Sequence, residues 1–363
     1  MKQLAAAALA LLVVACVSPG EHSPGGATDI ERIADRLEAT ADAAAAVTND
    51  PPRDAAHPAR NRQLVIPSGP VRAELGRPAE MNALMLQAAG PGPHPTLLLL
   101  HGLPGNERNL DLAQAARRAG WNVLTFTYRG AWGSEGTFSI QHAVADTEAA
   151  LAWLRSDVVA RDYGVDPARI VVAGHSMGGY MASHVAAQDV RNPAVLGISC
   201  QPDCRELRRN PPRAYPPLVG VILIDAWDIA ADARRAGAAG EAGRAALVAA
   251  FDDVGHALGP ITAADLADNI LRRGAEWDLM ALTPALARTR VLTIYATHGG
   301  AEENRALAET ILGCPISGEI RPGCNELLTA VEMDTDHAFA DHRVALAREV
   351  VGWLSGLRRG NAE

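Results

Sequence analysis

RIVVAGHSMGGYMASHVAAQ, residues 169–188, joins a short apolar run, a serine flanked by glycines and an alanine-rich run. The pattern predicts a strand over 169–173 and a helix over 177–188, with Ser176 on the sharp turn between them. A nucleophile on such a turn has strained backbone dihedral angles and needs small neighbours, which the G-x-S-x-G spacing provides. The N-terminus of the helix would point at negative charge developing on a substrate. The stretch therefore predicts that Ser176 is a nucleophile.

A second glycine-containing loop lies upstream of this serine. His101-Gly102-Leu103-Pro104-Gly105 follows the apolar run Thr96 to Leu100, which predicts a buried central strand. A loop at this place can turn a backbone N–H toward the oxygen of a reacting carbonyl. We expect the backbone N–H groups of Leu103 and Met177 to form the oxyanion hole.

The predicted base is His337. It follows the last predicted strand and precedes the last predicted helix, which is where the histidine of a Ser-His-acid triad occurs when the serine comes first in the chain. His298, at the end of the previous strand, and His342, in the final helix, are its rivals. His175 lies inside the serine turn, so we expect it to shape that turn.

Strands alternate with helices from about Arg62 onward. The predicted strands cover residues 64–66, 83–87, 96–100, 122–128, 169–173, 218–224, 291–295 and 327–333, and the predicted helices cover residues 110–119, 140–155, 177–188 and 343–354. This alternation predicts an α/β fold with a mostly parallel sheet and helices on both faces. Two segments interrupt it: residues 191–217, rich in Pro and Arg, and the alanine-rich residues 226–288, expected to form a helical lid.

On these motifs the chain resembles the α/β-hydrolase superfamily, and within it the prolyl oligopeptidase-like and dienelactone hydrolase-like branch. The matching residues are His101-Gly102, Tyr128-Arg129-Gly130, Trp132-Gly133-Ser134, the hexapeptide from Gly174 to Gly179, and Asp336-His337. The resemblance covers roughly residues 62–358. It implies an α/β-hydrolase domain over residues 61–358 and a Ser-His-acid triad that acts through an acyl-enzyme.

The acid of that triad departs from the family pattern. The fold usually supplies an Asp just after the strand predicted at residues 291–295, but no Asp occurs between Val291 and Ile320. Glu302 and Glu303 stand in a stretch that resembles the corresponding His-Gly-x-x-Asp-Asp-Asn segment of prolyl oligopeptidase-like enzymes. Asp225, at the end of the preceding strand, is the competitor. We predict Glu302 as the partner of His337, with Glu303 and Asp225 as alternatives.

The N-terminus has the features of an export signal. Lys2 precedes the apolar run Leu4 to Val14, which is too short to span a bilayer, and Cys16 follows it in a sequence that resembles a bacterial lipobox. The sequence predicts a signal peptide over residues 1–16 with lipidation at Cys16, or alternatively an ordinary secretory signal. Residues 17–60 are expected to be a tether with an alanine-rich helix. The protein would then be exported to the bacterial cell envelope, either attached to a membrane by its lipid or periplasmic.

Four cysteines remain after Cys16, an even number for a chain with a leader. Cys200–Cys204 and Cys314–Cys324 are the simplest pairs of disulfides, and their spacings fit a zinc site poorly.

The net charge and the absence of cofactor motifs exclude several classes of function. The formal net charge is −9, so no basic surface for nucleic acid is expected, and no metal or cofactor motif occurs. We predict an enzyme that cleaves small-molecule carboxylic esters without a cofactor. A prolyl oligopeptidase-like peptidase is the first alternative, although residues 17–60 are too few for its propeller. A catalytically inactive binding module on the same fold is the second.

Overall fold

The computed structural model describes residues 43–69, 76–191, 215–316 and 323–359. The predictions for the signal peptide, for Cys16, for the pair Cys200–Cys204 and for most of the tether lie outside these residues. Among the described residues, no helix has the length and apolar composition needed to cross a membrane.

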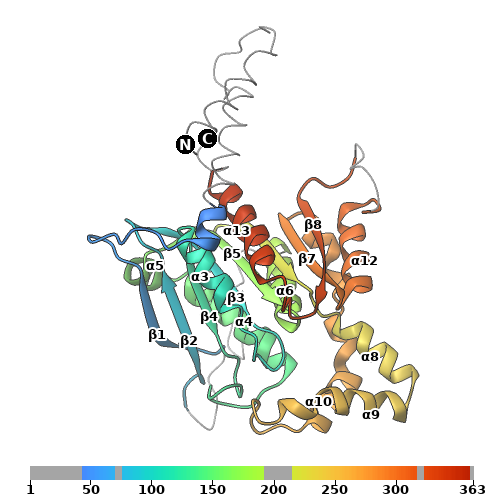
Figure 1. Ribbon diagram of the computed structural model, residues 1–363. Coiled ribbons are helices and arrows are strands. Elements are labelled where there is room, and N and C mark those ends of the chain that lie inside the picture. The colour runs from blue at the N-terminus through green and yellow to red at the C-terminus, as the bar shows by residue number, and fades with distance from the viewer. Residues whose placement is uncertain (1–42, 70–75, 192–214, 317–322, 360–363) are drawn as a thin grey trace, which may run out of the picture. The chain divides into compact units, whose positions relative to one another are not determined.

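An eight-stranded sheet forms the centre of the described structure (Figure 1). Its strands are β1 (Arg60–Pro67), β2 (Glu80–Gln87), β3 (His94–Leu100), β4 (Asn122–Phe126), β5 (Val165–His175), β6 (Gly220–Ile224), β7 (Val291–His298) and β8 (Leu328–Asp336). Their order across the sheet is β1-β2-β4-β3-β5-β6-β7-β8. β2 runs antiparallel to both of its neighbours, and the other pairs are parallel. The predicted mostly parallel sheet is confirmed.

Helices cover both faces of this sheet, which explains the continuous apolar runs of its central strands. The helices on and beside the faces are α3 (Leu110–Arg118), α4 (Ile140–Leu154), α5 (Asp157–Tyr163), α6 (Met177–Arg191), α11 (Thr283–Leu286), α12 (Ala301–Leu312) and α13 (Arg343–Arg359). Alternate residues of β3 enter opposite cores: Leu97 and Leu99 pack with α3 and α13, whereas Leu98 and Leu100 pack with α4 and α6. β4 and β6 are buried at every position.

The insertion at residues 226–288 is helical, as predicted, and we call it the cap. It contains α8 (Ile229–Ala238), α9 (Glu241–Ala250), the 3-10 helix η2 (Asp252–Val254), α10 (Ala263–Arg273), the 3-10 helices η3 (Gly274–Trp277) and η4 (Met280–Leu282), and α11. Figure 1 shows α8, α9 and α10 gathered in one group. Three backbone hydrogen bonds connect the cap to the segment between β4 and α4: Trp132 N–H donates to Ala257 O at 2.9 Å, Gly259 N–H to Gly130 O at 2.6 Å, and Phe138 N–H to Gly259 O at 3.3 Å.

The end of the predicted tether packs against the α/β domain. Residues 43–48 are helical, and Ala43 and Ala46 are buried in the same core as α3 and α13. Arg118 of α3 donates hydrogen bonds to the carbonyl oxygens of Ala46 and Val47, at 2.5 and 3.2 Å. The compact domain therefore begins before residue 61, which was the predicted start of the domain.

A disulfide joins Cys314, just after α12, to Cys324, just before β8, with the two Cα atoms 5.8 Å apart. This is one of the two predicted pairs.

Candidate active site

Ser176 occupies the turn between β5 and α6 in the strained conformation that the G-x-S-x-G pattern predicts. Its φ is +58°, in the left-handed region that residues with a side chain seldom adopt. A Cβ on Gly174 would lie 1.9 Å from the carbonyl oxygen of Gly178, and a Cβ on Gly178 would lie 2.4 Å from that of Leu100. The turn can therefore form only with glycine at both positions, because the backbones of β3, β5 and α6 meet there.

The loop after β3 lies directly against Ser176. A Cβ on Gly102 would come within 2.9 Å of the Ser176 Cβ, and Leu103 lines the same cavity as Ser176. Met177 is the first residue of α6, where backbone N–H groups have no partner within the helix. Both residues predicted for the oxyanion hole therefore lie next to Ser176, and their role as donors stays a prediction.

Two side chains hold this loop. The imidazole Nδ1–H of His101 donates to the carbonyl oxygen of Gly102 at 2.6 Å, and burial lowers the pKa of His101 to about 4. Trp132 donates its indole N–H to the carbonyl oxygen of Pro104 at 2.8 Å. The backbone near Leu103 is thus fixed from both sides, as a preorganised oxyanion hole requires.

His337 comes from the end of β8, and its Nδ1 lies 2.5 Å from Oδ2 of Asp225, at the end of β6. The Asp225 side chain is fully buried, whereas 48% of the His337 side chain is exposed. Backbone N–H groups also donate to this carboxylate, from Gly300 at 3.0 Å and from Ala296 at 3.3 Å. Asp225 is therefore a fixed acceptor that orients the ring and leaves Nε2 of His337 as the nitrogen able to take a proton.

The prediction of Glu302 as the partner of His337 is wrong in this structure. The backbone N–H of Gly300, just before α12, points at Asp225, and Glu302 in the first turn of that helix is exposed. Glu303, the second candidate, forms an ion pair with Arg235 of the cap at 2.5 Å. Asp225, the competitor, makes the contact because β6 lies between β5 and β7 and ends beside Ser176.

The histidines named as rivals form other contacts. His298 pairs with Asp334 at 3.2 Å, and His342 pairs with Asp341 at 2.9 Å. His175 donates its Nε2–H to the backbone carbonyl of His337 at 2.8 Å. Burial, and next the nearby His337, lower the pKa of His175 to about 4, so it is neutral near pH 7. It thus holds the backbone of His337, and its expected role in shaping the serine turn stays a prediction.

Asn304 of α12 holds the backbone beside the site and was given no role from the sequence. It is fully buried, and its side chain bonds both the N–H and the carbonyl of Ala226 at 3.0 Å. This clamp fixes the backbone immediately after Asp225. The only signal in the sequence was its position at the end of the Gly-rich stretch that follows β7.

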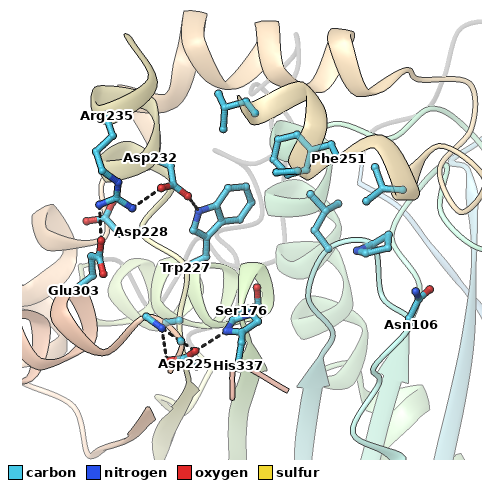
Figure 2. Close-up of a pocket in the computed structure, with 18 of the residues that line it drawn as sticks. Asn106, Ser176, Asp225, Trp227, Asp228, Asp232, Arg235, Phe251, Glu303 and His337 are labelled. Atoms are coloured by element: carbon cyan, nitrogen blue, oxygen red, sulfur yellow. Dashed lines mark hydrogen bonds and ion pairs between the residues drawn. The ribbon is translucent and has the colours of Figure 1, made fainter. Parts of the chain in front are cut away.

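A cavity of about 720 Å³ opens over Ser176 and His337 (Figure 2). Its apolar lining comes from the loop after β3 and from the cap: Leu103, Pro104, Trp227, Leu247, Ala250, Phe251 and Val254. Its charged lining is Asp228, Asp232, Arg235 and Glu303, in addition to Asp225. A largely apolar space beside a serine and a histidine suits a substrate with an apolar group. Among the described residues, no cluster of His, Cys, Asp or Glu could hold a metal ion.

Comparisons with known proteins agree with this fold. The model of the alpha/beta hydrolase family matches residues 97–349. EstE1, a thermophilic carboxylesterase cloned from a metagenomic library, aligns over 94% of this chain and 100% of its own with a TM-score of 0.52 and 18% identity. An esterase from Pyrobaculum calidifontis aligns over 96% of this chain and 98% of its own with a TM-score of 0.50 and 15% identity.

Curated relatives match a shorter part of the chain. An uncharacterized protein of Mycobacterium tuberculosis strain H37Rv is 40% identical over 108 residues, which are 29% of this chain and 35% of that protein. Lysophosphatidylserine lipase ABHD12 of Danio rerio is 28% identical over 124 residues, which are 33% of this chain and 29% of the lipase. The chain thus spans about a third of the length of these relatives. The family model covers well over half of the chain, and the chain belongs to the alpha/beta hydrolase family.

Proposed function

We propose that the protein is a serine hydrolase that cleaves carboxylic esters, with Ser176 as nucleophile, His337 as general base and acid, and Asp225 as the carboxylate that orients His337. One observation carries the proposal. Ser176, on its strained turn, and His337, bonded to the buried Asp225, line one cavity that also contains Leu103 of the candidate oxyanion loop. That set of groups is what acyl transfer through a serine needs.

The reaction proceeds in two halves. Nε2 of His337 takes the hydroxyl proton of Ser176 as the oxygen attacks the ester carbonyl, and Asp225 stabilises the imidazolium that forms. The N–H groups of Leu103 and Met177 stabilise the oxyanion, and the C–O bond to the alcohol breaks as His337 gives the alcohol its proton. Water then attacks the acyl-enzyme, with His337 again removing a proton, and the carboxylic acid leaves. No step requires a metal or an organic cofactor.

An ester is the preferred substrate because the cavity has a mostly apolar lining of cap and loop residues. The two solved structures described above are an esterase and a carboxylesterase by name, and they support the fold on which this proposal rests. A neutral small molecule with an apolar acyl or alcohol group fits the cavity best.

The test is labelling with an alkyl fluorophosphonate, followed by turnover of p-nitrophenyl butyrate. We expect the wild-type protein to be labelled at Ser176 and to hydrolyse the ester. Ser176→Ala should retain the fold and lose turnover by about 10⁴-fold or more. A folded Ser176→Ala protein that still turns the ester over at an appreciable rate would disprove the proposal.

Lipidation at Cys16 after export belongs to the same proposal, and it rests on the sequence of residues 1–16 alone. Mass spectrometry of the protein from membranes of a bacterial host should find an acylated mature N-terminus at Cys16. Cys16→Ser should abolish that modification and release the protein from the membrane fraction. An unmodified N-terminus in membrane-bound wild-type protein would reject lipidation.

A further inference from the structure

Trp227 stands directly over the nucleophile. Its backbone N–H donates to the carbonyl oxygen of Ser176 at 3.0 Å, so the residue is anchored to the serine turn itself. Its side chain lines the cavity, and Figure 2 shows the indole above Ser176, between Asp232 on one side and Phe251 on the other. The position of this indole therefore helps to set the space available next to the reacting carbonyl.

A chain of polar contacts holds the indole on one side. Trp227 donates its Nε1–H to Oδ2 of Asp232, on α8, at 2.5 Å. The other carboxylate oxygen of Asp232 accepts from Arg235, which also pairs with Glu303 of α12 at 2.5 Å. A hydrogen bond to an ionised acceptor is stronger than one between neutral groups. The chain thus fixes the indole and connects α8 of the cap to α12 beside the sheet.

The opposite side of the indole faces the apolar part of the cavity. The ring of Phe251 lies 6.2 Å from that of Trp227, centroid to centroid, at an angle of 57°. We use the term apolar chamber for the space lined by Leu103, Pro104, Trp227, Leu247, Ala250, Phe251 and Val254. Trp227 separates this chamber from the charged residues Asp232, Arg235 and Glu303, which line the cavity on the far side of the indole (Figure 2).

We propose that Asp232 is a positioning residue which, by holding Trp227, sets the size of the apolar acyl group that the chamber accepts. The inference rests on the proposed esterase function and deepens it. Without the carboxylate, the indole N–H loses its acceptor and the ring is free to leave its place, which widens the chamber. Because one methylene in a closely fitting pocket changes selectivity by about 10-fold or more, a displaced wall should be visible in the chain-length profile.

The experiment measures kcat/KM for p-nitrophenyl acetate, butyrate and octanoate. The proteins compared are the wild type, Asp232→Ala, Trp227→Phe, the double variant of these two, and a control. Each single variant should raise the ratio of octanoate to acetate turnover by about 10-fold, mainly through KM for the octanoate ester. The double variant should show no more than the larger single effect, because Asp232 acts through Trp227.

The control is Asp268→Ala. Asp268 of α10 pairs with Arg244 of α9 at 2.7 Å, so this variant removes a carboxylate–arginine pair from the same cap outside the cavity. It should leave the chain-length ratio at the wild-type value. Asp232→Leu, which lacks the acceptor but fills a similar volume, serves if Asp232→Ala does not fold, and it should shift the ratio in the same direction.

Three results would overturn the inference: an unchanged ratio in folded Asp232→Ala or Asp232→Leu, additive effects in the double variant, or the same shift in Asp268→Ala. Labelling of Ser176 by the fluorophosphonate separates these from failure of the proposed function. Wild-type protein that is neither labelled nor active rejects the esterase proposal and this inference together. Wild-type protein that is labelled and active, with variants of unaltered selectivity, rejects only the role of Asp232.

Discussion

Asp225→Asn changes a single atom of the carboxylate that holds His337, and the surrounding hydrogen bonds determine which atom. Oδ1 accepts from the N–H groups of Ala296 at 3.3 Å and Gly300 at 3.2 Å, whereas Oδ2 faces Nδ1 of His337 at 2.5 Å and also accepts from Gly300 at 3.0 Å. An asparagine with its oxygen at the Oδ1 position keeps an acceptor for both backbone donors and turns its NH₂ group toward the histidine. The residue's φ of +42° is one that asparagine tolerates as well as aspartate, so the backbone can stay in place.

The NH₂ group forces the wrong tautomer on the ring. It can only donate, so Nδ1 of His337 must become an acceptor and the ring proton must move to Nε2, which then cannot take the proton of Ser176. The same substitution in the chymotrypsin triad is the reference for the size of this effect, about 10⁴-fold in kcat. At about 1.36 kcal/mol for each power of ten, that is about 5.4 kcal/mol of lost transition-state stabilisation.

The assay is hydrolysis of p-nitrophenyl butyrate by the wild type, Asp225→Asn and Glu302→Gln, with circular dichroism to confirm folding. Glu302 is exposed, so Glu302→Gln should keep turnover within about twofold, the effect of a surface change of about 0.5 kcal/mol. If Asp225→Asn keeps more than a tenth of wild-type turnover while Glu302→Gln loses most of it, then the reasoning from the hydrogen bonds is wrong.

Three further predictions concern stability. Burial lowers the pKa values of His101 and His175 from 6.5 to about 4. Between these values the unfolded chain binds protons that the folded chain does not, so the free energy of unfolding should fall as the pH drops from about 6.5 toward 4. The expected loss at pH 5 is about 2 kcal/mol for each histidine. Urea unfolding at pH 7 and pH 5 measures this loss, and equal free energies of unfolding at the two pH values would contradict the prediction. The variant His175→Gln should depend less on pH than the wild type. Gly179→Ala should lower the free energy of unfolding by about 1–3 kcal/mol, because the added Cβ would lie 2.6 Å from the Cβ of Ala226. A melting temperature equal to that of the wild type would show that the turn accommodates this methyl group and would contradict the prediction. Replacing Cys314 and Cys324 together by serine should cost about 2–3 kcal/mol in urea unfolding with unchanged kcat, and equal stability of the two proteins would show that the disulfide contributes nothing.

Local patterns were sufficient to predict the alternation of strands and helices. The apolar runs of β3, β4 and β6 and the spacing of the helices between them reflect burial on both faces, which a sequence displays directly. The ends of the elements were less visible. β5 was predicted over residues 169–173 but extends over Val165–His175, since pairing with β3 reaches Val165 and pairing with β6 reaches His175. Those partners are far away in the chain, so no local pattern displays them.

For the site too, the sequence displayed local requirements but not contacts between distant parts of the chain. The strained turn at Ser176 was predictable because its requirements are local: small residues on both sides, a strand before and a helix after. The place of His337 after the last strand was predictable from chain order. Trp227 and Asp232 gave no sequence signal, because their role comes from a cavity that five separate segments of the chain line.

The two glycines after β7 explain why Glu302 was preferred and why the preference failed. A Gly-rich loop can fold back on itself, so Gly299 and Gly300 are compatible with a path that brings Glu302 to the histidine. In the structure, a Cβ on Gly299 would lie 2.2 Å from Oδ2 of Asp225, whereas a Cβ on Gly300 would lie 2.9 Å from Nδ2 of Asn304. The absent side chain of Gly299 therefore leaves room for a carboxylate that arrives from the neighbouring strand, and the N–H of Gly300 binds it. In this chain, Gly299 favours Asp225 over Glu302 as the partner of His337, because a side chain at position 299 would occupy the place of the Asp225 carboxylate.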